Sequence, residues 1–385
     1  MTKPGTRTPS TEATVTAYTD ESGNSGLNIF DNTQPWFWTA TLLTESDLER
    51  DASHFRTLAE NLGEAEIHAN ELGSARLNSI ARSLCSTIVL HNCRFVFTVV
   101  EKRHVASMKL VDTLLDAGNN KAVHYFHYNA RIFRLTLATY LMLITSPQSQ
   151  EEFWQLYRNR DEKSFKRVLK RLSWNVRTKI HDRRVQEILG DAISYARERP
   201  LDVLDMKRSA LDSPNMVAFS TLLHGLHSIL GPEKKRIKRF VHDEQNQFGA
   251  HMREMFNVFG GVKFTETLIS AAPSMEKVDT YACAVEMSKL PLVGLQLVDV
   301  ALWLAKRHFE GRALGEECSH LLDEILRRSH SSEFSADQLI IAVNEGVREI
   351  FGHPFNEEDA KRATEFRDEM ETHRKSMMRA ALKQE

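Results

Sequence analysis

Strand-forming sequence occurs in two separate parts of this 385-residue chain, and a long helical stretch lies between them. Runs rich in β-branched and aromatic residues, bounded by turn-forming residues, are typical of strands. Such runs cover residues 14–20, 36–43, 94–100, 237–242 and 263–271. Residues 104–232 instead repeat apolar positions at the spacing of an α-helix. The pattern predicts an α/β core that is interrupted by a helical insertion.

Glycine and proline are scarce. The 17 glycines and 10 prolines together make up about 7% of the chain, whereas their average usage is about 12%. Their scarcity favours long helices, with breaks in the middle stretch at Pro147, Pro200 and Pro214. Residues 294–309 have a strong helical period, and the chain reads as helical from Glu317 onward. We therefore expect the chain to close with C-terminal helices.

These patterns divide the chain into five parts. A disordered tail is expected at residues 1–13, which contain almost no apolar side chains. The other expected parts are the first half of the core (14–103), the helical insertion (104–233), the second half of the core (234–310) and a C-terminal helical region (311–385).

The charge balance and the cysteines exclude several classes of protein. The 50 basic and 52 acidic residues give a net charge of -2, so a nucleic-acid partner would have to be bound by local basic patches. Cys85, Cys93, Cys283 and Cys318 form no C-x-x-C pair, which is typical of reduced thiols rather than a zinc ribbon or a disulfide framework. The longest apolar run, residues 135–144, is too short to span a bilayer. We expect a soluble, cytoplasmic protein that does not bind membranes.

Acidic residues follow two of the predicted strands. Asp20 and Glu21 lie where the first strand meets a glycine turn, and Asp243 and Glu244 follow the strand at 237–242. Side chains at such positions are held by the sheet and still reach solvent. Both pairs are therefore candidates for catalytic or metal-binding residues.

A further acid stands in the apolar helix at 294–309. Asp299 and Gln296 are three residues apart and share one face of that helix. A carboxylate in an apolar stripe needs compensation, because burying an unpaired charge costs several kcal/mol, and a bound cation can provide it. Mg²⁺ prefers carboxylate and water oxygens, and two ions about 3.5–4 Å apart can promote phosphodiester cleavage. The three acidic positions predict a divalent-metal site.

Three short motifs carry a resemblance to a known family: D-E-S-G at 20–23, D-E at 243–244 and L-Q-L-x-D at 295–299. In this order they resemble the domain-of-unknown-function 3800 (DUF3800) family of bacteria and phages. That family is grouped with the ribonuclease H-like superfamily, which has a mixed sheet and uses clustered acids to hold two Mg²⁺ or Mn²⁺ ions. The resemblance covers about residues 14–103 and 234–310.

The resemblance implies a role for each matched residue. Asp20, Asp243 and Asp299 would be metal ligands, and Glu21 and Glu244 would be supporting or alternative ligands. We assign Gln296 to a supporting position behind Asp299, because a buried glutamine more often forms hydrogen bonds than ligates a metal.

Glu66 and His68 are the remaining catalytic candidates. The glutamate that the superfamily carries on its first core helix has no clear counterpart here, and Glu66 is the candidate for its place. His68 could transfer a proton, because its pKa is ordinarily near neutral. The alternative for His68 is that it caps a surface helix.

Each acidic motif also has a purely structural interpretation. Asp20 could form an Asx-type turn, and Asp243 with Glu244 could cap the helix that begins near residue 249. Lys289 or Lys306 could pair with Asp299. Other enzyme classes are poor fits, because the sequence has no nucleophile elbow, no P-loop and no G-x-G-x-x-G after a strand.

Basic residues cluster in two places despite the balanced total. Such clusters can neutralise phosphates, and an aromatic side chain among them can stack on a base. The alternative is a solvated helix face with a buried tryptophan. The candidate nucleic-acid-binding residues are Lys166, Arg167, Lys170, Arg171, Trp174, Arg177, Lys235 and Arg236.

The sequence thus predicts a ribonuclease H-like α/β fold and a Mg²⁺- or Mn²⁺-dependent nuclease, with DNA or RNA as its partner. One alternative is a catalytically silent adaptor that binds protein or nucleic acid, and another is a phosphoesterase acting on small phosphates. The family's occurrence in mobile and defence-related settings makes a role in phage defence conceivable. The C-terminal helices could join two copies of the chain or bind a partner protein.

Overall fold

A six-stranded sheet forms the centre of the computed structural model, in the order β7-β4-β1-β2-β3-β8. The structure describes residues 13–23, 28–204, 212–245, 247–265, 274–352, 354 and 356–383. The strands are β1 (Thr14–Ser22), β2 (Trp36–Thr44), β3 (Arg94–Glu101), β4 (Arg236–Asp243), β7 (Val285–Ser288) and β8 (Ser329–Phe334). Four of the five predicted strands, from both core halves, therefore lie in one sheet as β1 to β4.

The sheet is mixed. Strands β1, β2 and β3 are antiparallel neighbours, whereas β4 pairs parallel with β1, β7 with β4 and β8 with β3. Thr19 of β1 pairs with His242 of β4, so the next residues, Asp20 and Asp243, lie side by side where both strands end. The predicted α/β class and mixed sheet are confirmed.

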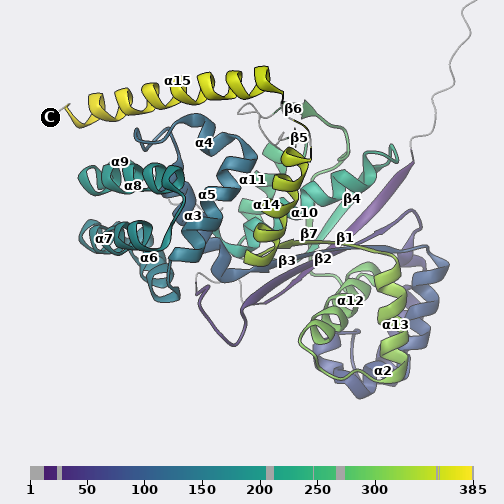
Figure 1. Ribbon diagram of the computed structural model, residues 1–385. Helices are drawn as coiled ribbons and strands as arrows, with labels where there is room; N and C mark the ends of the chain where they lie inside the picture. Colours follow the sequence, from purple (N-terminus) through teal and green to yellow (C-terminus); the bar gives the residue numbers. More distant parts are fainter. Residues whose placement is uncertain are drawn as a thin grey trace, which may run out of the picture.

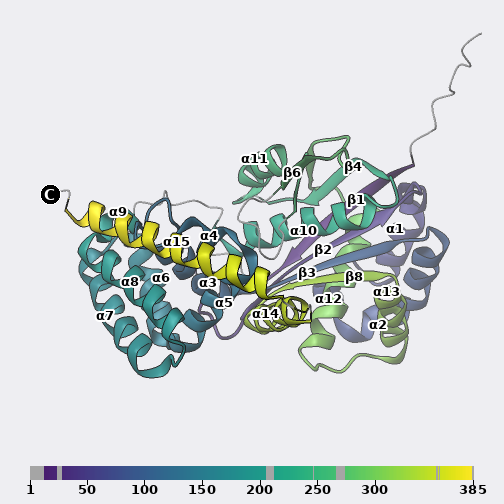
Figure 2. The ribbon, with the colours of Figure 1, turned by 45° about the horizontal axis from the view of Figure 1, so that its top comes forward.

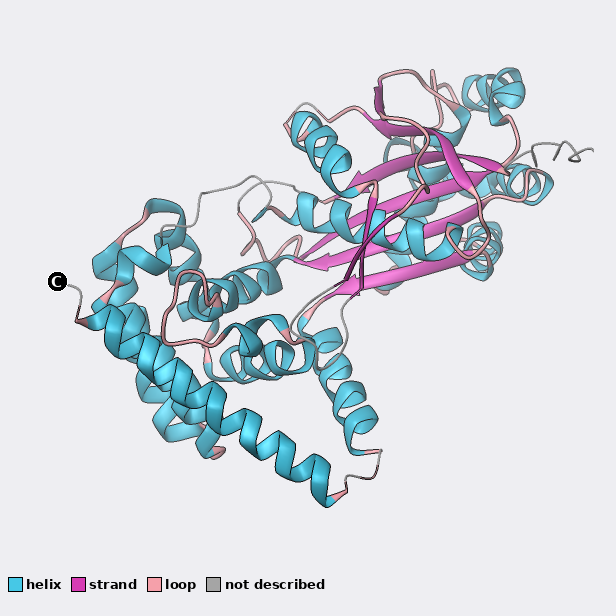
Figure 3. Cartoon of the chain, turned by 90° about the horizontal axis from the view of Figure 1, so that it is seen from above, coloured by secondary structure: helices cyan, strands magenta, loops and turns pink. Residues whose placement is uncertain are grey.

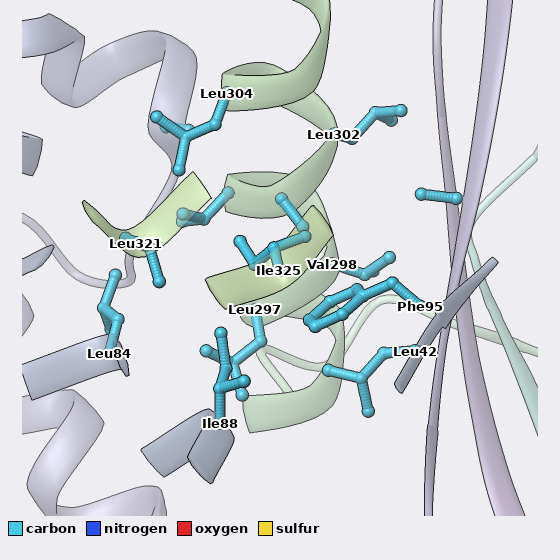
Figure 4. Packing of buried hydrophobic residues seen from close by; sticks show 14 of the residues in the cluster. Leu42, Leu84, Ile88, Phe95, Leu297, Val298, Leu302, Leu304, Leu321 and Ile325 are labelled. Atoms are coloured by element: carbon cyan, nitrogen blue, oxygen red, sulfur yellow. The ribbon is translucent and has the colours of Figure 1, made fainter. Parts of the chain in front are cut away.

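One face of the sheet is covered by helices from both halves of the core: α1 (Ala52–Asn61), α2 (Ala69–Leu90), α12 (Val293–Phe309) and α13 (Glu316–Arg327). A short 3₁₀ helix, η1 (Leu48–Asp51), precedes α1. Leu42 and Phe95 of the sheet share one apolar cluster with Leu297 and Val298 of α12, as Figure 4 shows. Tyr18 belongs to the same cluster, so the side chains that alternate with it on β1 point to the opposite face.

The opposite face is covered by α10 (Pro214–Leu230) and α11 (Gly249–Phe259) (Figure 2). Val15 and Ala17 of β1 pack there against Phe219 and Leu222 of α10. We expected α10 to belong to the helical insertion, but its apolar residues cover the sheet. Two short strands, β5 (Val262–Thr265) and β6 (Ser274–Lys277), form a separate antiparallel sheet. Part of the predicted strand at 263–271 lies outside the described residues.

The rest of the insertion forms a helical lobe beside the sheet (Figures 1 and 3). It has a cluster of buried side chains of its own, including Leu110, Leu141, Leu169 and Leu189. Its helices are α3 (Lys102–Leu115), α4 (Tyr125–Asn129), α5 (Arg131–Ile144), α6 (Pro147–Asn159), α7 (Glu162–Lys179), α8 (Arg183–Glu198) and α9 (Pro200–Leu204).

The three prolines that predicted breaks each begin a helix. Pro147, Pro200 and Pro214 are the first residues of α6, α9 and α10, a position where the missing N–H costs no hydrogen bond. Among the described residues, no helix is both long and apolar enough to cross a membrane.

The C-terminal region is only partly as predicted. Helices α13, α14 (Ala336–Phe351) and α15 (Glu357–Leu382) are present, but the prediction of continuous helix after Glu317 is wrong, because β8 forms the outer strand beside β3. The sequence of β8 is S-H-S-S-E-F, which carries little apolar alternation. An edge strand needs few apolar residues, so its sequence signal was weak.

Candidate active site

A cavity of about 800 Å³ lies where β1 and β4 end, next to α12. It is lined by most of the residues that the sequence singled out for chemistry. They are Asp20, Glu21, Glu66, His68, Asp243, Gln296 and Asp299. Residues more than two hundred positions apart in the chain therefore meet at one site.

Asp20 is the most strongly perturbed acid at this site. It lies two residues after Tyr18 on β1, so it shares the face of Tyr18 and points toward α12. Its Oδ1 accepts a hydrogen bond of 2.7 Å from the amide N–H of Glu21. Burial raises the pKa of Asp20 well above its usual range, and the nearby charges of Asp299 and Asp243 raise it further. This bond reaches only the next residue, whereas the side chain of an Asx turn bonds the N–H two residues on, and it does not explain why three acids converge.

Asp299 is held by the start of α2. Its Oδ2 accepts a 2.7 Å hydrogen bond from the amide of Ala69 and lies 3.2 Å from Nδ1 of His68. The hydrogen bond to Asp299 raises the pKa of His68 to about 9. His68 occupies the cap position of α2, as the alternative interpretation expected, but its side chain makes no capping bond. Its ring faces Asp299 instead.

The lysines proposed as partners of Asp299 bind elsewhere. Lys289 forms a 3.0 Å ion pair with Glu244, and Lys306 donates a 3.2 Å hydrogen bond to Oγ of Ser22. Glu244 is absent from the described residues that line the cavity. The structure thus separates Glu244 from the other predicted ligands, because this residue follows the end of β4 and turns toward Lys289.

Gln296 fixes the segment that carries Glu66 and His68. Its Oε1 accepts a 2.8 Å hydrogen bond from the amide of Ile67, and its Nε2 donates a 2.7 Å bond to the carbonyl of Pro291. The supporting position predicted for Gln296 agrees with these bonds, because they tie residues 66–69 to α12.

Glu21 belongs to a buried polar group on the other side of β1. Its Oε1 accepts hydrogen bonds from Nε2 of Gln245 and from Nδ2 of Asn215, the latter at 3.3 Å. Its Oε2 lies 3.6 Å from Nε2 of His242, which is fully buried. Burial raises the pKa of Glu21 to about 8 and lowers that of His242 to about 4. Sequence reasoning missed Asn215, Gln245 and His242; only His242 had a signal, its place beside Asp243.

Asp243 faces the same cavity from β4. Burial raises its pKa, and Asp299 adds to this increase. The alternative that Asp243 and Glu244 cap the next helix is wrong, because the cap residue of α11 is Phe248, which makes no side-chain capping bond within the described residues.

The predicted nucleic-acid-binding residues lie away from this cavity. Most of them belong to α7, on the helical lobe, whereas α12 covers the sheet (Figure 1). Three are held in ion pairs, Lys166 with Glu162 and both Arg167 and Arg171 with Glu152. Lys170 and Arg177 are exposed.

Of the remaining three members of that set, two are held in ion pairs and one is exposed. Lys235 pairs with Glu45 and Glu233, and Arg236 with Asp279. Trp174 is 61% exposed and lies under the guanidinium of Arg177, so the alternative of a buried tryptophan is wrong. Among the described residues that line the cavity, none comes from this predicted set; binding of nucleic acid by the set stays a prediction.

The cavity also contains basic and aromatic residues of α12: Trp303, Lys306 and Arg307 line it. Sequence reasoning considered Lys306 only as a partner of Asp299, and it did not single out Trp303 or Arg307. All three follow Asp299, by four, seven and eight positions, and so lie on the same helical face. This spacing was the signal that could have identified them.

The donor chemistry of the site suits a hard divalent cation, because Mg²⁺ and Mn²⁺ favour carboxylate oxygens. A cation would also relieve the repulsion that raises the pKa of Asp20. Among the described residues, however, no three Asp, Glu, His or Cys side chains form a ready-made metal-binding group. The acids share a cavity, and their side chains are not arranged as a closed ligand sphere.

No known family model, curated protein or solved structure matches the chain. The resemblance to the DUF3800 family therefore rests on the three sequence motifs alone.

Proposed function

We propose that the protein is a divalent-metal-dependent nuclease with its active site in this cavity. The observation that carries the proposal is the convergence of Asp20, Asp243 and Asp299, from two neighbouring parallel strands and a helix, in one cavity. The pKa of Asp20 supports it, because burial raises this pKa well above its usual range and the carboxylates of Asp299 and Asp243 raise it further. Buried like charges are costly unless a counter-charge compensates them.

Asp20, Asp243 and Asp299 would hold Mg²⁺ or Mn²⁺, and Glu66 stands at the same cavity as a further oxygen donor. A bound divalent ion supplies an activated water and stabilises the leaving oxygen. His68 is positively charged at neutral pH, because its pKa is about 9. It can therefore bind a phosphate oxygen or donate a proton to the leaving group.

A ribonuclease H-like core is part of this proposal. The mixed sheet, with antiparallel β1 to β3 and parallel β4 and β7, supports it. The acids also lie at the ends of adjacent strands and on a following helix, as the resemblance to the DUF3800 family implies. A role in phage defence would follow from that resemblance only.

The test is a cleavage panel with single- and double-stranded DNA and RNA, titrated with Mg²⁺ and Mn²⁺. The variants Asp20→Asn, Asp243→Asn and Asp299→Asn should each lose at least 100-fold in kcat, the scale of losing a major transition-state interaction. Asp112→Asn is the matched control, because Asp112 is also a buried aspartate with a raised pKa but lies in α3 of the helical lobe. It should cleave like the wild type.

Three results would contradict the proposal in different ways. Full activity of Asp20→Asn would exclude the acidic site as the catalytic centre. Cleavage of nucleotides or small phosphate esters without cleavage of any polymer would indicate a phosphoesterase. Absence of all hydrolysis by the wild type would favour a binding adaptor.

A further inference from the structure

We infer that Lys306 and Arg307, on the last turns of α12, form a phosphate-binding subsite for a polynucleotide strand beside the acidic centre. This inference rests on the proposed nuclease function and deepens it, because a second phosphate contact selects a polymer over a mononucleotide.

One face of α12 carries both the acidic and the basic part of the cavity. Asp299, Trp303 and Lys306 recur along this face and line the cavity together. Seven residues separate Asp299 from Lys306, which is about 10 Å of helix axis at 1.5 Å per residue. Each strand of a DNA duplex places one phosphate per about 3.4 Å of duplex axis, so a strand bound at the acids would bring another phosphate within reach of Lys306.

Lys306 and Arg307 are available for an anion. Neither forms an ion pair with a described residue, whereas the other lysine and the other arginine of the cavity do: Lys289 pairs with Glu244, and Arg312 with Glu310. Lys306 makes one side-chain hydrogen bond, to Ser22, and Nη2 of Arg307 donates one of 3.3 Å to the carbonyl of Ala313. Nε of Arg307 is buried and has no hydrogen-bond partner among the described residues. Such an unsatisfied buried donor is costly, and a phosphate oxygen would satisfy it.

Lys102, at the start of α3, is fully buried, and its Nζ has no hydrogen-bond partner among the described residues. Burial lowers its pKa, and Asp31 and then Lys306 act on it electrostatically. Lys102 is not among the described residues that line the cavity, so the subsite depends on Lys306 and Arg307. Phe309 contacts Trp36 and Trp38 of β2 at ring distances of 5.2 and 5.0 Å, which fixes this end of α12 under the sheet.

Trp303 connects the two parts of the cavity. The guanidinium of Arg307 lies 4.7 Å from the centre of its ring, a cation–π contact that orients the arginine. An arginine held in this way presents its remaining N–H groups in a fixed fork, which suits a phosphate. The subsite is therefore built into the helix that supplies Asp299.

The test measures binding separately from cleavage. Fluorescein-labelled 20-nucleotide single-stranded DNA, single-stranded RNA and duplex DNA are titrated with the full-length protein in EDTA, at several salt concentrations between 50 and 200 mM. The double variant K306Q/R307Q should bind at least 10-fold more weakly than the wild type. The slope of log K against the logarithm of the salt concentration should become shallower by about 1.4–1.8, because each phosphate contact contributes about 0.7 in single strands and 0.9 in duplex.

Two further double variants serve as comparisons. K361Q/R367Q removes one lysine and one arginine from the exposed part of α15 and should bind like the wild type. K170Q/R177Q removes two exposed charges of α7 and tests the prediction, made from the sequence, that basic residues of this helix bind nucleic acid. Normal binding by K306Q/R307Q, loss of binding only in K170Q/R177Q, or no binding by the wild type would each overturn the subsite.

Cleavage by the same proteins keeps this inference distinct from the proposed function. In a functional nuclease, K306Q/R307Q should raise KM on polymers far more than it lowers kcat, because it removes binding remote from the scissile bond. If the wild type binds but never cleaves, and K306Q/R307Q abolishes the binding, the subsite stands and the nuclease proposal fails. If the wild type cleaves and KM is unchanged in the variant, only the subsite fails.

Discussion

Asp20 shows how the position of a single carboxylate can oppose folding. The protein buries its carboxylate close to Asp243 and Asp299, so folding is opposed by desolvation and by repulsion. Residues arranged in this way are common at functional sites, where the unfavourable energy is offset elsewhere in the molecule. Removing the charge should therefore have opposite effects on stability and on metal binding.

Asp20→Asn should raise the melting temperature in EDTA by several degrees, because it removes a destabilising buried charge. Mn²⁺ should stabilise the wild type. If the Kd for the metal is about one hundredth of its concentration, binding raises the free energy of unfolding by about 2.7 kcal/mol. The variant should lose most of that metal-dependent gain. Thermal unfolding with and without 1–5 mM Mn²⁺ measures both effects, and a wild type indifferent to Mn²⁺ would contradict the metal site.

Glu21 predicts a dependence of stability on pH. Burial raises its pKa in the folded protein from the ordinary value of 4.5 to about 8, so between these values the folded protein binds a proton that the unfolded chain has lost. Its contribution to stability is therefore full below pH 4.5 and declines as pH rises toward 8. Relative to the wild type, Glu21→Gln should gain stability across this interval and reach a plateau above pH 8.

Unfolding of both proteins in EDTA, at several pH values from 4.5 to 9, measures this difference. The glutamine can still accept the hydrogen bonds from Asn215 and Gln245, so the change in charge dominates. A difference that is independent of pH would show that Glu21 titrates normally.

At the scale of elements, the site depends on how closely α12 approaches β1. A Cβ atom on Gly294 would lie 2.3 Å from ring atoms of Tyr18, a distance that requires one element to move. Glycine at this position lets the helix lie against the strand, which places Asp299 beside Asp20. The close approach is thus a condition for the cavity.

Gly294→Ala should lower the free energy of unfolding by about 1–3 kcal/mol, the usual cost of overpacking. It should also weaken Mn²⁺ stabilisation, because α12 carries Asp299. Gly190→Ala in α8 is the matched control, since a Cβ there meets no atom within 4 Å. The control should be more stable by up to about 1 kcal/mol through helix propensity. Chemical denaturation of both variants compares them, and equal effects would contradict the packing argument.

At the scale of the whole molecule, the chain returns from the sheet to the helical lobe at its C-terminal end, where α15 lies along the lobe (Figure 1). Arg374 of α15 is fully buried there. Its guanidinium forms ion pairs of 2.9 Å with Glu371 and 2.8 Å with Asp191, and donates a 3.0 Å hydrogen bond to the carbonyl of Ala122. These contacts join α15 to two parts of the lobe.

Arg374→Ala should release α15 and lower the free energy of unfolding by about 1–3 kcal/mol, because Glu371 and Asp191, both partly buried, lose the guanidinium that donates to them. Limited proteolysis should cut the variant within α15 much faster than the wild type. Stabilisation by Mn²⁺ should persist, because the acidic cavity lies on the sheet. Protection of α15 equal to that of the wild type would show that apolar contacts alone hold the helix.

Much of this architecture could be predicted from the sequence, because periodic apolar patterns report local structure. The strands at 14–20, 36–43, 94–100 and 237–242 and the helix at 294–309 are confirmed. The strand β8 was missed because an outer strand can be polar. The position of α10 on the sheet was missed because its apolar residues show only that the helix is buried. The element against which it packs depends on the fold.

Sequence patterns alone singled out the candidate residues: acids at strand ends and in an apolar helix stand out, because a carboxylate at such a position is costly unless something compensates it. Only the tertiary structure decided which of them meet. Pairing of β1 with β4 and packing of α12 brought Asp20, Asp243 and Asp299 together, left Glu244 with Lys289, and placed Lys306 and Arg307 of α12, rather than α7, beside the acids. The physical reason is that electrostatic proximity depends on distances across the fold, and local periodicity contains no information about them.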